Sequence, residues 1–376
     1  MKNKLIARTV RVALAAALLC TSFSALATQY TVTDLGTLGG TQSYAYGINS
    51  SGEVAGESTN NSGNQYAFLY SNGRMTDLGT LGGTASYAFG INTSGEVVGW
   101  AANSTGNTNA FLYSNGSMTD LGTLGGKQSL AFGINTSGEV VGWSSNSAGN
   151  TNAFLYSNGS MTDLGTLGGT QSYAYGINST GEVVGYSTNS AGNWNAFLYS
   201  NGVMQNLGTL GGTQSYAYGI NTSGEVVGQT TNNAGNSLAF IYSNGSMISL
   251  GTLGGTQSLA NNINTIGEVV GWADNSAGNK NAFLYSNGVM TNLNALIGVA
   301  SSTYTLNSAV AINDLGQIAV NGTVNATGQS AAFLLTPVTS ASSSGVPAPA
   351  TLGLLSVSLL GLLFASRKRQ TSTVQR

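Results

Sequence analysis

The sequence predicts an all-β fold: a seven-bladed β-propeller made of 43-residue, four-stranded repeats and closed by the N-terminal strand. Three observations carry this prediction. Three short motifs each recur seven times. Each regular unit holds the turn signals of antiparallel hairpins, which pair neighbouring strands. The repeat region also begins, after residues 1–27, with a segment that matches the fourth strand of a unit, and its last unit ends with a segment that matches the third strand.

The repeat is defined by its motifs, because self-similarity at a fixed period indicates a repeat architecture. The first is Asp-Leu-Gly-Thr-Leu-Gly-Gly, whose first residue varies and of which the seventh copy keeps the Leu that follows; the second is Ile-Asn-x-x-Gly and the third is Ala-Phe. They start at Asp34, Asp77, Asp120, Asp163, Asn206, Ser249 and Asn292; at Ile48, Ile91, Ile134, Ile177, Ile220, Ile263 and Ile312; and at Ala67, Ala110, Ala153, Ala196, Ala239, Ala282 and Ala332. Only the last unit is irregular, with seven extra residues between Asn292 and Ala332.

One unit is expected to contain four strands. In the second unit they are predicted at 87–92, 96–101, 109–114 and 117–121. The turn between the first two ends on Gly95, which suits a positive φ. Asn115-Gly116, between the last two, is typical of a type I′ hairpin turn. Four antiparallel strands in 43 residues are typical of one propeller blade.

The chain ends favour a closed ring. Residues 30–35 resemble the fourth strand at 117–121, whereas 332–335 resemble the third, and no Asn-Gly turn follows. The N-terminal segment is therefore expected to pair with the stretch around Phe333. The alternative is a β-solenoid, which would stack parallel strands and gives no reason for this offset.

Charge separates the ends of the chain from its body. Residues 28–345 contain three basic residues, Arg74, Lys127 and Lys280, and all 13 acidic residues, which leaves a net charge of −10. Nucleic-acid binding requires clustered Lys and Arg, so we expect no nucleic-acid partner.

The N-terminal residues 1–27 have the parts of a signal peptide: a basic start, an apolar stretch and the small-x-small triplet Ala25-Leu26-Ala27. Cleavage is expected after Ala27. Cys20 gives a lipoprotein alternative, which the bulky Leu19 before it disfavours. The body, predicted at 28–338, has no cysteine.

The C-terminal end is expected to be a Ser-rich linker at 339–345 and a sorting tail at 346–376 with a short transmembrane helix at 350–366. The tail carries a Pro-x-Pro motif, an apolar stretch and a basic cluster, formed by Val346, Pro347, Pro349, Arg367, Lys368 and Arg369. It resembles the PEP-CTERM sorting signal of Gram-negative bacteria, although Ala348 replaces the usual Glu. The resemblance implies an exosortase-type sorting enzyme as partner, transient anchoring in the inner membrane, and export to the cell surface or an exopolysaccharide-rich matrix. The alternative is an ordinary single-pass anchor.

The three body motifs together resemble the HAF extracellular repeat over residues 30–336. That family is named for His-Ala-Phe, and this chain contains no histidine. The equivalent positions are Tyr66, Asn109, Asn152, Asn195, Leu238, Asn281 and Ala331. Any role of the family histidine is therefore not available here, and the resemblance implies fold and location more than activity.

The composition excludes His- or Cys-based catalysis and metal sites in the body, so no catalytic residue, metal or cofactor is predicted. A row of repeated acids, Glu53, Glu96, Glu139, Glu182, Glu225 and Glu268, is expected to consist of solvated hairpin residues, with a Ca²⁺-binding ring as the alternative. The row Asp34, Asp77, Asp120 and Asp163 is expected to bind nearby turn amides.

Aromatic residues form the candidate ligand-binding set. Strand alternation places the start of the first strand and the end of the second toward one face, which gathers Tyr44, Tyr87, Tyr173, Tyr216, Trp100, Trp143, Tyr186 and Trp272. Aromatic faces beside amide-rich loops suit sugars, so the sequence predicts a non-catalytic surface or matrix protein that binds exopolysaccharide or another glycan through this face. Packing between blades is the alternative role for these rings, and a carbohydrate-active hydrolase or lyase is the alternative function.

Overall fold

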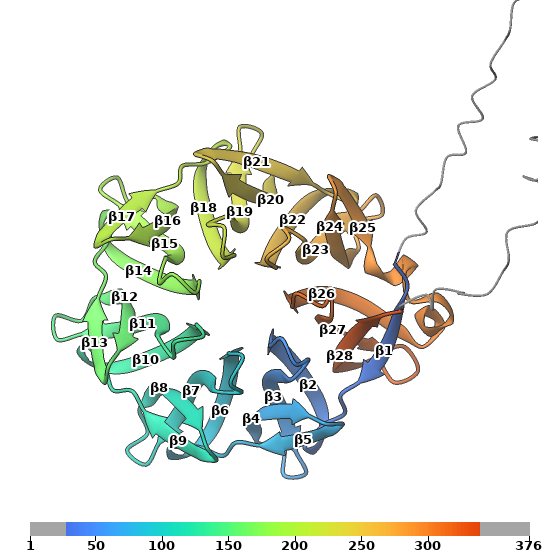
Figure 1. Ribbon diagram of the computed structural model, residues 1–376, viewed down its shortest axis with the longest axis horizontal. Coiled ribbons are helices and arrows are strands. Elements are labelled where there is room, and N and C mark those ends of the chain that lie inside the picture. The colour runs from blue at the N-terminus through green and yellow to red at the C-terminus, as the bar shows by residue number, and fades with distance from the viewer. Residues whose placement is uncertain (1–27, 339–376) are drawn as a thin grey trace, which may run out of the picture. The chain divides into compact units, whose positions relative to one another are not determined.

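The computed structural model describes residues 28–338, which form four-stranded antiparallel sheets arranged around a common centre (Figure 1). The all-β class is confirmed, and the arrangement is β-propeller-like. The antiparallel pairing differs from the parallel stacking that a solenoid requires. The count of seven blades and their closure into one ring remain predictions.

Each sheet runs from an innermost first strand to an outermost fourth strand. The first strands are β2 (Gly39–Ile48), β6 (Gly82–Ile91), β10 (Gly125–Ile134), β14 (Gly168–Ile177), β18 (Gly211–Ile220), β22 (Gly254–Ile263) and β26 (Tyr304–Ile312). The second strands are β3 (Val54–Asn60), β7 (Val97–Asn103), β11 (Val140–Asn146), β15 (Val183–Asn189), β19 (Val226–Asn232), β23 (Val269–Asn275) and β27 (Ile318–Val324).

The third and fourth strands complete the sheets. The third strands are β4 (Gln65–Ser71), β8 (Thr108–Ser114), β12 (Thr151–Ser157), β16 (Trp194–Ser200), β20 (Ser237–Ser243), β24 (Lys280–Ser286) and β28 (Gln329–Pro337). The fourth strands are β5 (Arg74–Asp77), β9 (Ser117–Asp120), β13 (Ser160–Asp163), β17 (Val203–Asn206), β21 (Ser246–Gly251), β25 (Val289–Asn292) and, from the other end of the chain, β1 (Tyr30–Asp34). A single parallel bridge, Thr151 to Gln171, links the sheets β10–β13 and β14–β17.

The turns between the third and fourth strands have the backbone conformation that the sequence predicts. The Asn of each Asn-Gly turn has φ near 52° and is followed by a positive-φ Gly, as at Asn115 and Gly116. These are the dihedral angles that a type I′ turn needs. The first strands, however, start earlier than predicted: β6 begins at Gly82 rather than Tyr87. The last two glycines of the first motif therefore belong to the strand, where Gly83 lies so close to Ala102 that a Cβ would clash with it.

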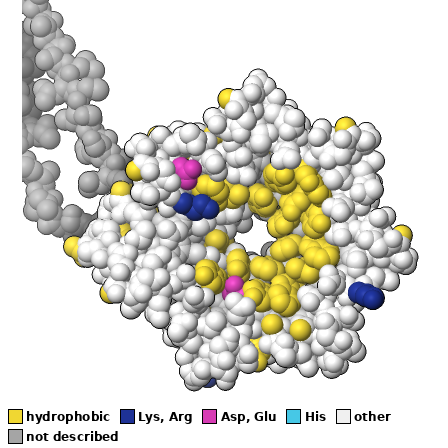
Figure 2. All heavy atoms as spheres, turned by 180° about the vertical axis from the view of Figure 1, so that it is seen from behind, with side chains coloured by type: hydrophobic (Ala, Val, Ile, Leu, Met, Phe, Trp, Pro, Cys, Tyr) yellow, Lys and Arg dark blue, Asp and Glu magenta, His cyan; other side chains and the backbone are white. Residues whose placement is uncertain are grey.

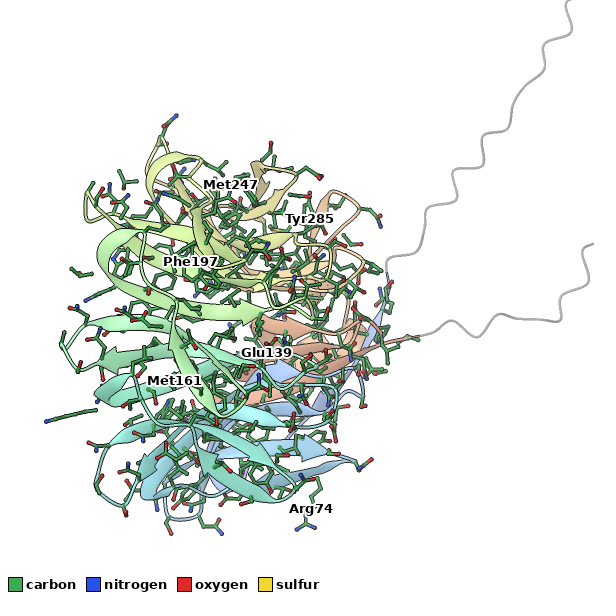
Figure 3. All side chains as sticks on the ribbon, turned by 60° about the vertical axis from the view of Figure 1, so that its left-hand side comes forward. Arg74, Glu139, Met161, Phe197, Met247 and Tyr285 are labelled. Carbon is green, nitrogen blue, oxygen red and sulfur yellow. The ribbon has the colours of Figure 1, made fainter. Side chains whose placement is uncertain are left out.

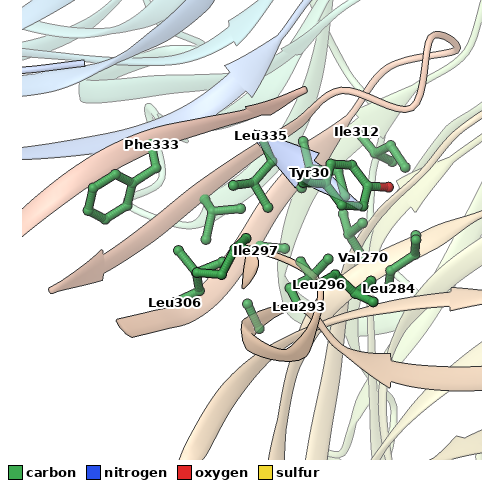
Figure 4. Packing of buried hydrophobic residues seen from close by; sticks show 14 of the residues in the cluster. Tyr30, Val270, Leu284, Leu293, Leu296, Ile297, Leu306, Ile312, Phe333 and Leu335 are labelled. Atoms are coloured by element: carbon green, nitrogen blue, oxygen red, sulfur yellow. The ribbon is translucent and has the colours of Figure 1, made fainter. Parts of the chain in front are cut away.

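The N-terminal strand pairs with the last one, as the sequence predicts. β1 is antiparallel to β28, with Tyr30 opposite Pro337 and Asp34 opposite Phe333. Tyr30 is buried in the hydrophobic cluster that also contains Leu293, Leu296 and Leu335 (Figure 4). The backbone N–H of Tyr30 donates to the carbonyl oxygen of Leu296 at 2.9 Å.

The irregular segment of the last unit contributes Leu293, Leu296 and Ile297 to this cluster. It contains two short 3₁₀ helices, η1 (Leu293–Ala295) and η2 (Gly298–Ser302). The Asn292 side chain caps η1 by accepting from the backbone N–H of Asn294 at 2.9 Å. The insertion thus supports the place where the two ends of the body pair.

A series of asparagine side chains ties neighbouring sheets together at the ends of the first strands. Each Nδ2 donates to the backbone carbonyl of the equivalent Asn in the next sheet at 2.9–3.3 Å, and the last, Asn313, donates to Asn49. The donors are Asn49, Asn92, Asn135, Asn178, Asn221, Asn264 and Asn313. All are buried, so these bonds lie where an unpaired amide would be costly.

The repeated glutamates belong to this asparagine series and are not simply solvated hairpin residues. Asn135 Nδ2 donates to Glu139 Oε2 at 2.7 Å, and the same contact recurs at Glu53, Glu96, Glu182, Glu225 and Glu268. These hairpin glutamates are half-buried rather than fully solvated, because the turn folds each carboxylate back onto its own asparagine. Within residues 28–338, no three His, Cys, Asp or Glu side chains are grouped as a metal site would require.

The aspartate row behaves as predicted. Asp34, Asp77, Asp120 and Asp163 each accept from the backbone N–H two residues later at 2.8–2.9 Å.

Side chains of the body are shown in Figure 3, where Phe197 lies among the strands and Arg74 projects from the periphery. Phe197 and its six equivalents in the third strands are fully buried, so the repeat carries its own core.

The predicted signal peptide, linker and sorting tail lie outside the described residues. This applies to Val346, Pro347, Pro349, Arg367, Lys368 and Arg369 and to the predicted helix at 350–366. Within residues 28–338, no helix is long and apolar enough to cross a membrane.

Candidate functional site

Strand pairing brings the aromatic residues predicted from the sequence into cross-strand pairs. Tyr87 lies opposite Trp100, with stacked rings whose centroids are 4.4 Å apart. Tyr173 lies opposite Tyr186 at 5.2 Å. The others face non-aromatic partners: Tyr44 opposite Glu57, Trp143 opposite Leu130, Tyr216 opposite Gln229 and Trp272 opposite Leu259.

Several of these rings also contact the neighbouring sheet. Trp143 on β11 meets Tyr173 on β14 at 5.9 Å, and Tyr186 on β15 meets Tyr216 on β18 at 4.9 Å, both edge to face. These contacts correspond to the packing role that the sequence leaves open as an alternative. Of the eight predicted residues, only Trp272 lines the central cavity described next.

The central cavity is lined by aromatic residues that the sequence analysis missed. Five first strands each place one ring there, two residues beyond the predicted position: Tyr46, Phe89, Phe132, Tyr175 and Tyr218. The cavity has a volume of about 650 Å³. The sequence does contain a signal for these rings. Residues i and i+2 of a strand share a face, so the residues two positions after the predicted ones belong to the same face. On the face shown in Figure 2, hydrophobic side chains surround the central opening, with an acidic side chain among them.

The five rings form a continuous arc. Tyr46 meets Phe89 at 5.0 Å, Phe89 meets Phe132 at 5.0 Å, Phe132 stacks on Tyr175 at 4.5 Å, and Tyr175 meets Tyr218 at 5.3 Å. Burial raises the pKa values of the Tyr175 and Tyr218 hydroxyls, and the Tyr175 hydroxyl shares a hydrogen bond of 3.1 Å with that of Tyr186. The arc therefore offers apolar ring faces with a few neutral hydroxyls.

The rest of the cavity wall combines apolar residues, such as Leu259 and Val310, with a group of polar side chains. Asn261, Asn262, Ser308 and Asn321 line it where the aromatic position is interrupted in the last two sheets. Asn321 spans the last and first sheets, since its Oδ1 accepts from the N–H of Ala45 at 2.8 Å and its Nδ2 donates to the Ala45 carbonyl at 2.9 Å. A side-chain amide has two donor hydrogens and two acceptor lone pairs, so Asn321 retains one of each. The wall thus combines ring faces with amides, as sugar sites do.

One cation also lies at this wall. The Lys280 ammonium sits 3.6 Å from the centroid of the Trp272 ring, and both residues line the cavity. Such a cation–π contact contributes about 0.5–2 kcal/mol. Asp274 lies directly across the strand pair from Lys280 and offsets its charge.

Glu57 is the unusual ionisable group near the cavity. It is 5% exposed, its Oε1 accepts from the Tyr46 hydroxyl at 3.1 Å, and its Oε2 has no hydrogen-bond partner within residues 28–338. Burial raises the pKa of Glu57 to about 7, although the Tyr46 hydrogen bond opposes this shift. The sequence analysis missed Glu57 because it considered only the aromatic residues at this repeat position, which is held elsewhere by Trp, Tyr or amides.

The raised pKa predicts a pH-dependent stability. A carboxyl whose pKa is higher in the folded state stabilises the fold below its unfolded pKa near 4.5, and this contribution is lost as pH rises through about 7. At pH 8 we expect Glu57→Gln to be more stable than the parent by on the order of 2 kcal/mol, because the buried charge is removed. At pH 4 the two should unfold alike.

Urea denaturation at both pH values measures this difference. Glu139→Gln is the matched control, since it removes the same charge from a carboxylate that accepts from Asn135. If Glu57→Gln destabilised the protein equally at both pH values, Glu57 would not carry a buried charge at pH 8.

Comparisons with known proteins add a likeness of fold. No family model matches the sequence, and no curated protein matches it. A puromycin-hydrolyzing peptidase from Mycobacterium tuberculosis is similar in structure, with a TM-score of 0.50 and 10% identity over 81% of this chain and 56% of that one. The BP39L lectin from Burkholderia pseudomallei gives a TM-score of 0.45 and 10% identity over 81% of this chain and 95% of the lectin. TolB from Acinetobacter baumannii gives 0.41 and 17%, covering 55% of this chain and 52% of TolB. At 10% identity the likeness to the peptidase is one of fold alone.

Proposed function

We propose that this protein is an exported, non-catalytic glycan-binding protein whose body is a closed seven-bladed propeller, with the central cavity as the binding site. The arc of five rings facing a wall of amides is the observation that carries the proposal. Sugar C–H faces stack on aromatic rings while their hydroxyls need donors and acceptors. The proposal moves the site from the predicted outer set of rings to the inner arc.

The closed ring is supported by two series of contacts. The Asn313 side chain donates to the carbonyl of Asn49 at 2.9 Å, which returns the asparagine series to its start. The N–H of Ala332 donates to Ser43 Oγ at 3.1 Å, as that of Ala67 does to Ser86 Oγ in the next sheet at 2.9 Å. The asparagine bond thus joins every sheet to its successor and the last sheet to the first. The serine bond also joins the last sheet to the first, as it joins each of the first five sheets to its successor.

A binding role is favoured over hydrolysis by the state of the acids. A glycosidase needs two carboxylates facing each other across the scissile bond. The repeated glutamates instead accept from asparagines, and the aspartates accept from turn amides. Glu57 is the exception, with no equivalent acid in the other repeats.

The location is proposed from the sequence. The signal-peptide pattern at residues 1–27 and the PEP-CTERM-like tail at 346–376 imply export through the inner membrane of a Gram-negative bacterium to the cell surface or matrix. An exosortase-type enzyme would then be the processing partner, and exopolysaccharide the available glycan.

A glycan array with the full chain, combined with a reducing-sugar assay, tests this function. Phe132→Ala is expected to weaken retention of a bound glycan by about fivefold, because it removes a ring worth roughly 1 kcal/mol of stacking at the centre of the arc. Val203→Ala is the control, since Val203 is 64% exposed and lies on β17, at the outer edge of its sheet. Release of new reducing ends, or equal retention by both variants, would contradict the proposal.

A further inference from the structure

Glu57 breaks the repeat at a position that faces the next sheet. The equivalent residues of the other units are Trp100, Trp143, Tyr186, Gln229, Trp272 and Asn321, none of them acidic. The carboxylate is 5% exposed. A buried carboxylate is costly unless it is paired, so this substitution needs a partner that the described residues do not supply.

The groups around Glu57 are tyrosine hydroxyls. Tyr44 lies opposite it on β2, Tyr46 donates to its Oε1, and Tyr87 faces it from β6. The Tyr87 hydroxyl donates instead to Gln65 Oε1. Oε2 therefore has no donor from residues 28–338, and no cationic side chain in this part of the chain forms a hydrogen bond with Glu57.

This carboxylate adjoins the cavity through Tyr46. Tyr46 lines the cavity and holds Glu57 by one hydrogen bond, and its ring packs against Phe89. Ring faces attract cations, and the same wall already receives an ammonium where Lys280 lies over Trp272. The body charge of −10 further favours a positively charged ligand.

We propose that Glu57, which lies beside the cavity between Tyr46 and Tyr87, binds an ammonium group, and hence that the glycan is an amino-sugar polymer with free amines. The choice of a glycan rests on the proposed function, whereas the ammonium site stands on the unpartnered carboxylate and the rings. The positive charge of the ammonium would offset the carboxylate charge of Glu57 while the C–H face of the sugar stacks on the arc.

Calorimetry with the full chain at pH 8 tests this inference. The probes are a trimethylated glucosamine oligomer, whose charge is fixed, the N-acetylated oligomer of equal length, and tetramethylammonium. We expect the charged oligomer to bind at least about tenfold more tightly than the acetylated one. Glu57→Gln should remove this preference, and Glu139→Gln, which removes the same charge elsewhere, should leave it unchanged.

The outcomes separate the two proposals. Equal binding of both oligomers, unaffected by Glu57→Gln, would overturn the ammonium site and leave glycan binding standing. Tetramethylammonium binding that depends on Glu57, with no glycan bound by the array, would support the ammonium site and contradict the glycan function. If Glu57→Gln fails to fold, a pH titration of the parent replaces it: tetramethylammonium binding should fall as pH drops from 8 to 5.5, and constant binding would overturn the inference.

Discussion

Removing β1 is expected to destabilise the body more than any point substitution. Deletion of residues 30–35 exposes the whole edge of β28 and takes Tyr30 and Leu35 out of their hydrophobic clusters. Burying each such side chain contributes about 1.5–3 kcal/mol, and the lost strand pairing adds to this. We therefore expect a loss of about 5 kcal/mol or more, seen as a midpoint lowered by on the order of 10 °C in a thermal melt.

The control for this deletion is Thr33→Ala, which changes an exposed residue of the same strand and should alter stability by less than about 0.5 kcal/mol. Images of the shortened body should show an opened assembly. A shortened body that melts like the parent, or a rod-shaped particle in the parent itself, would exclude closure by this strand.

Replacing one asparagine of the inter-sheet series is expected to have the next largest effect. Asn178 donates to Glu182 Oε2 at 2.7 Å and to the carbonyl of Asn221 at 3.2 Å, and it accepts from the N–H of Glu182 at 3.0 Å. Asn178→Ala leaves these buried groups without their partner, and each such group costs about 1–3 kcal/mol. We expect a loss of about 2–4 kcal/mol in urea denaturation at pH 7.

Asn178→Asp should be less stable than Asn178→Ala at pH 7 and should regain stability in acid. It places a second carboxylate beside Glu182, and like charges raise the pKa of the pair in the folded state. The folded state then binds more protons than the unfolded one, so stability increases as pH falls toward 4. Asn150→Ala, at an exposed turn position, is the control. Equal stability of the Ala and Asp variants across pH would show that Glu182 does not face this side chain.

The sequence predicted the secondary structure well where the turns dictate it. The Asn115-Gly116 dipeptide requires positive φ at both residues, so its hairpin could be placed from two letters. The pairing of Tyr30–Asp34 with the last strand followed from a similar local match between 30–35 and 117–121. The start of β6 at Gly82 could not be placed, because glycine has weak strand propensity and the pairing depends on the close approach of Ala102.

The candidate site was harder to predict because its position depends on contacts between sheets. Strand alternation placed Tyr87 and Trp100 on one face correctly, but the space between sheets is filled by their mutual stacking. Which member of the pair 87 and 89 reaches the centre depends on strand tilt and on the bulge between Ala88 and Gly90. The contact between Glu57 and Tyr46 likewise follows from three-dimensional packing, whereas Glu139 meets Asn135 within one local turn.

The pairing of β1 with β28 also has a consequence for two molecules at once. The segment that fastens the body is short, lies at one end of the chain and resembles the outer strand of every other unit. At high local concentration, as on a crowded surface, the same segment would complete a neighbouring molecule with identical bonds, since exchange of an identical element costs little. Reciprocal exchange of this strand would form dimers, and serial exchange would form fibres, in both cases without any new interface.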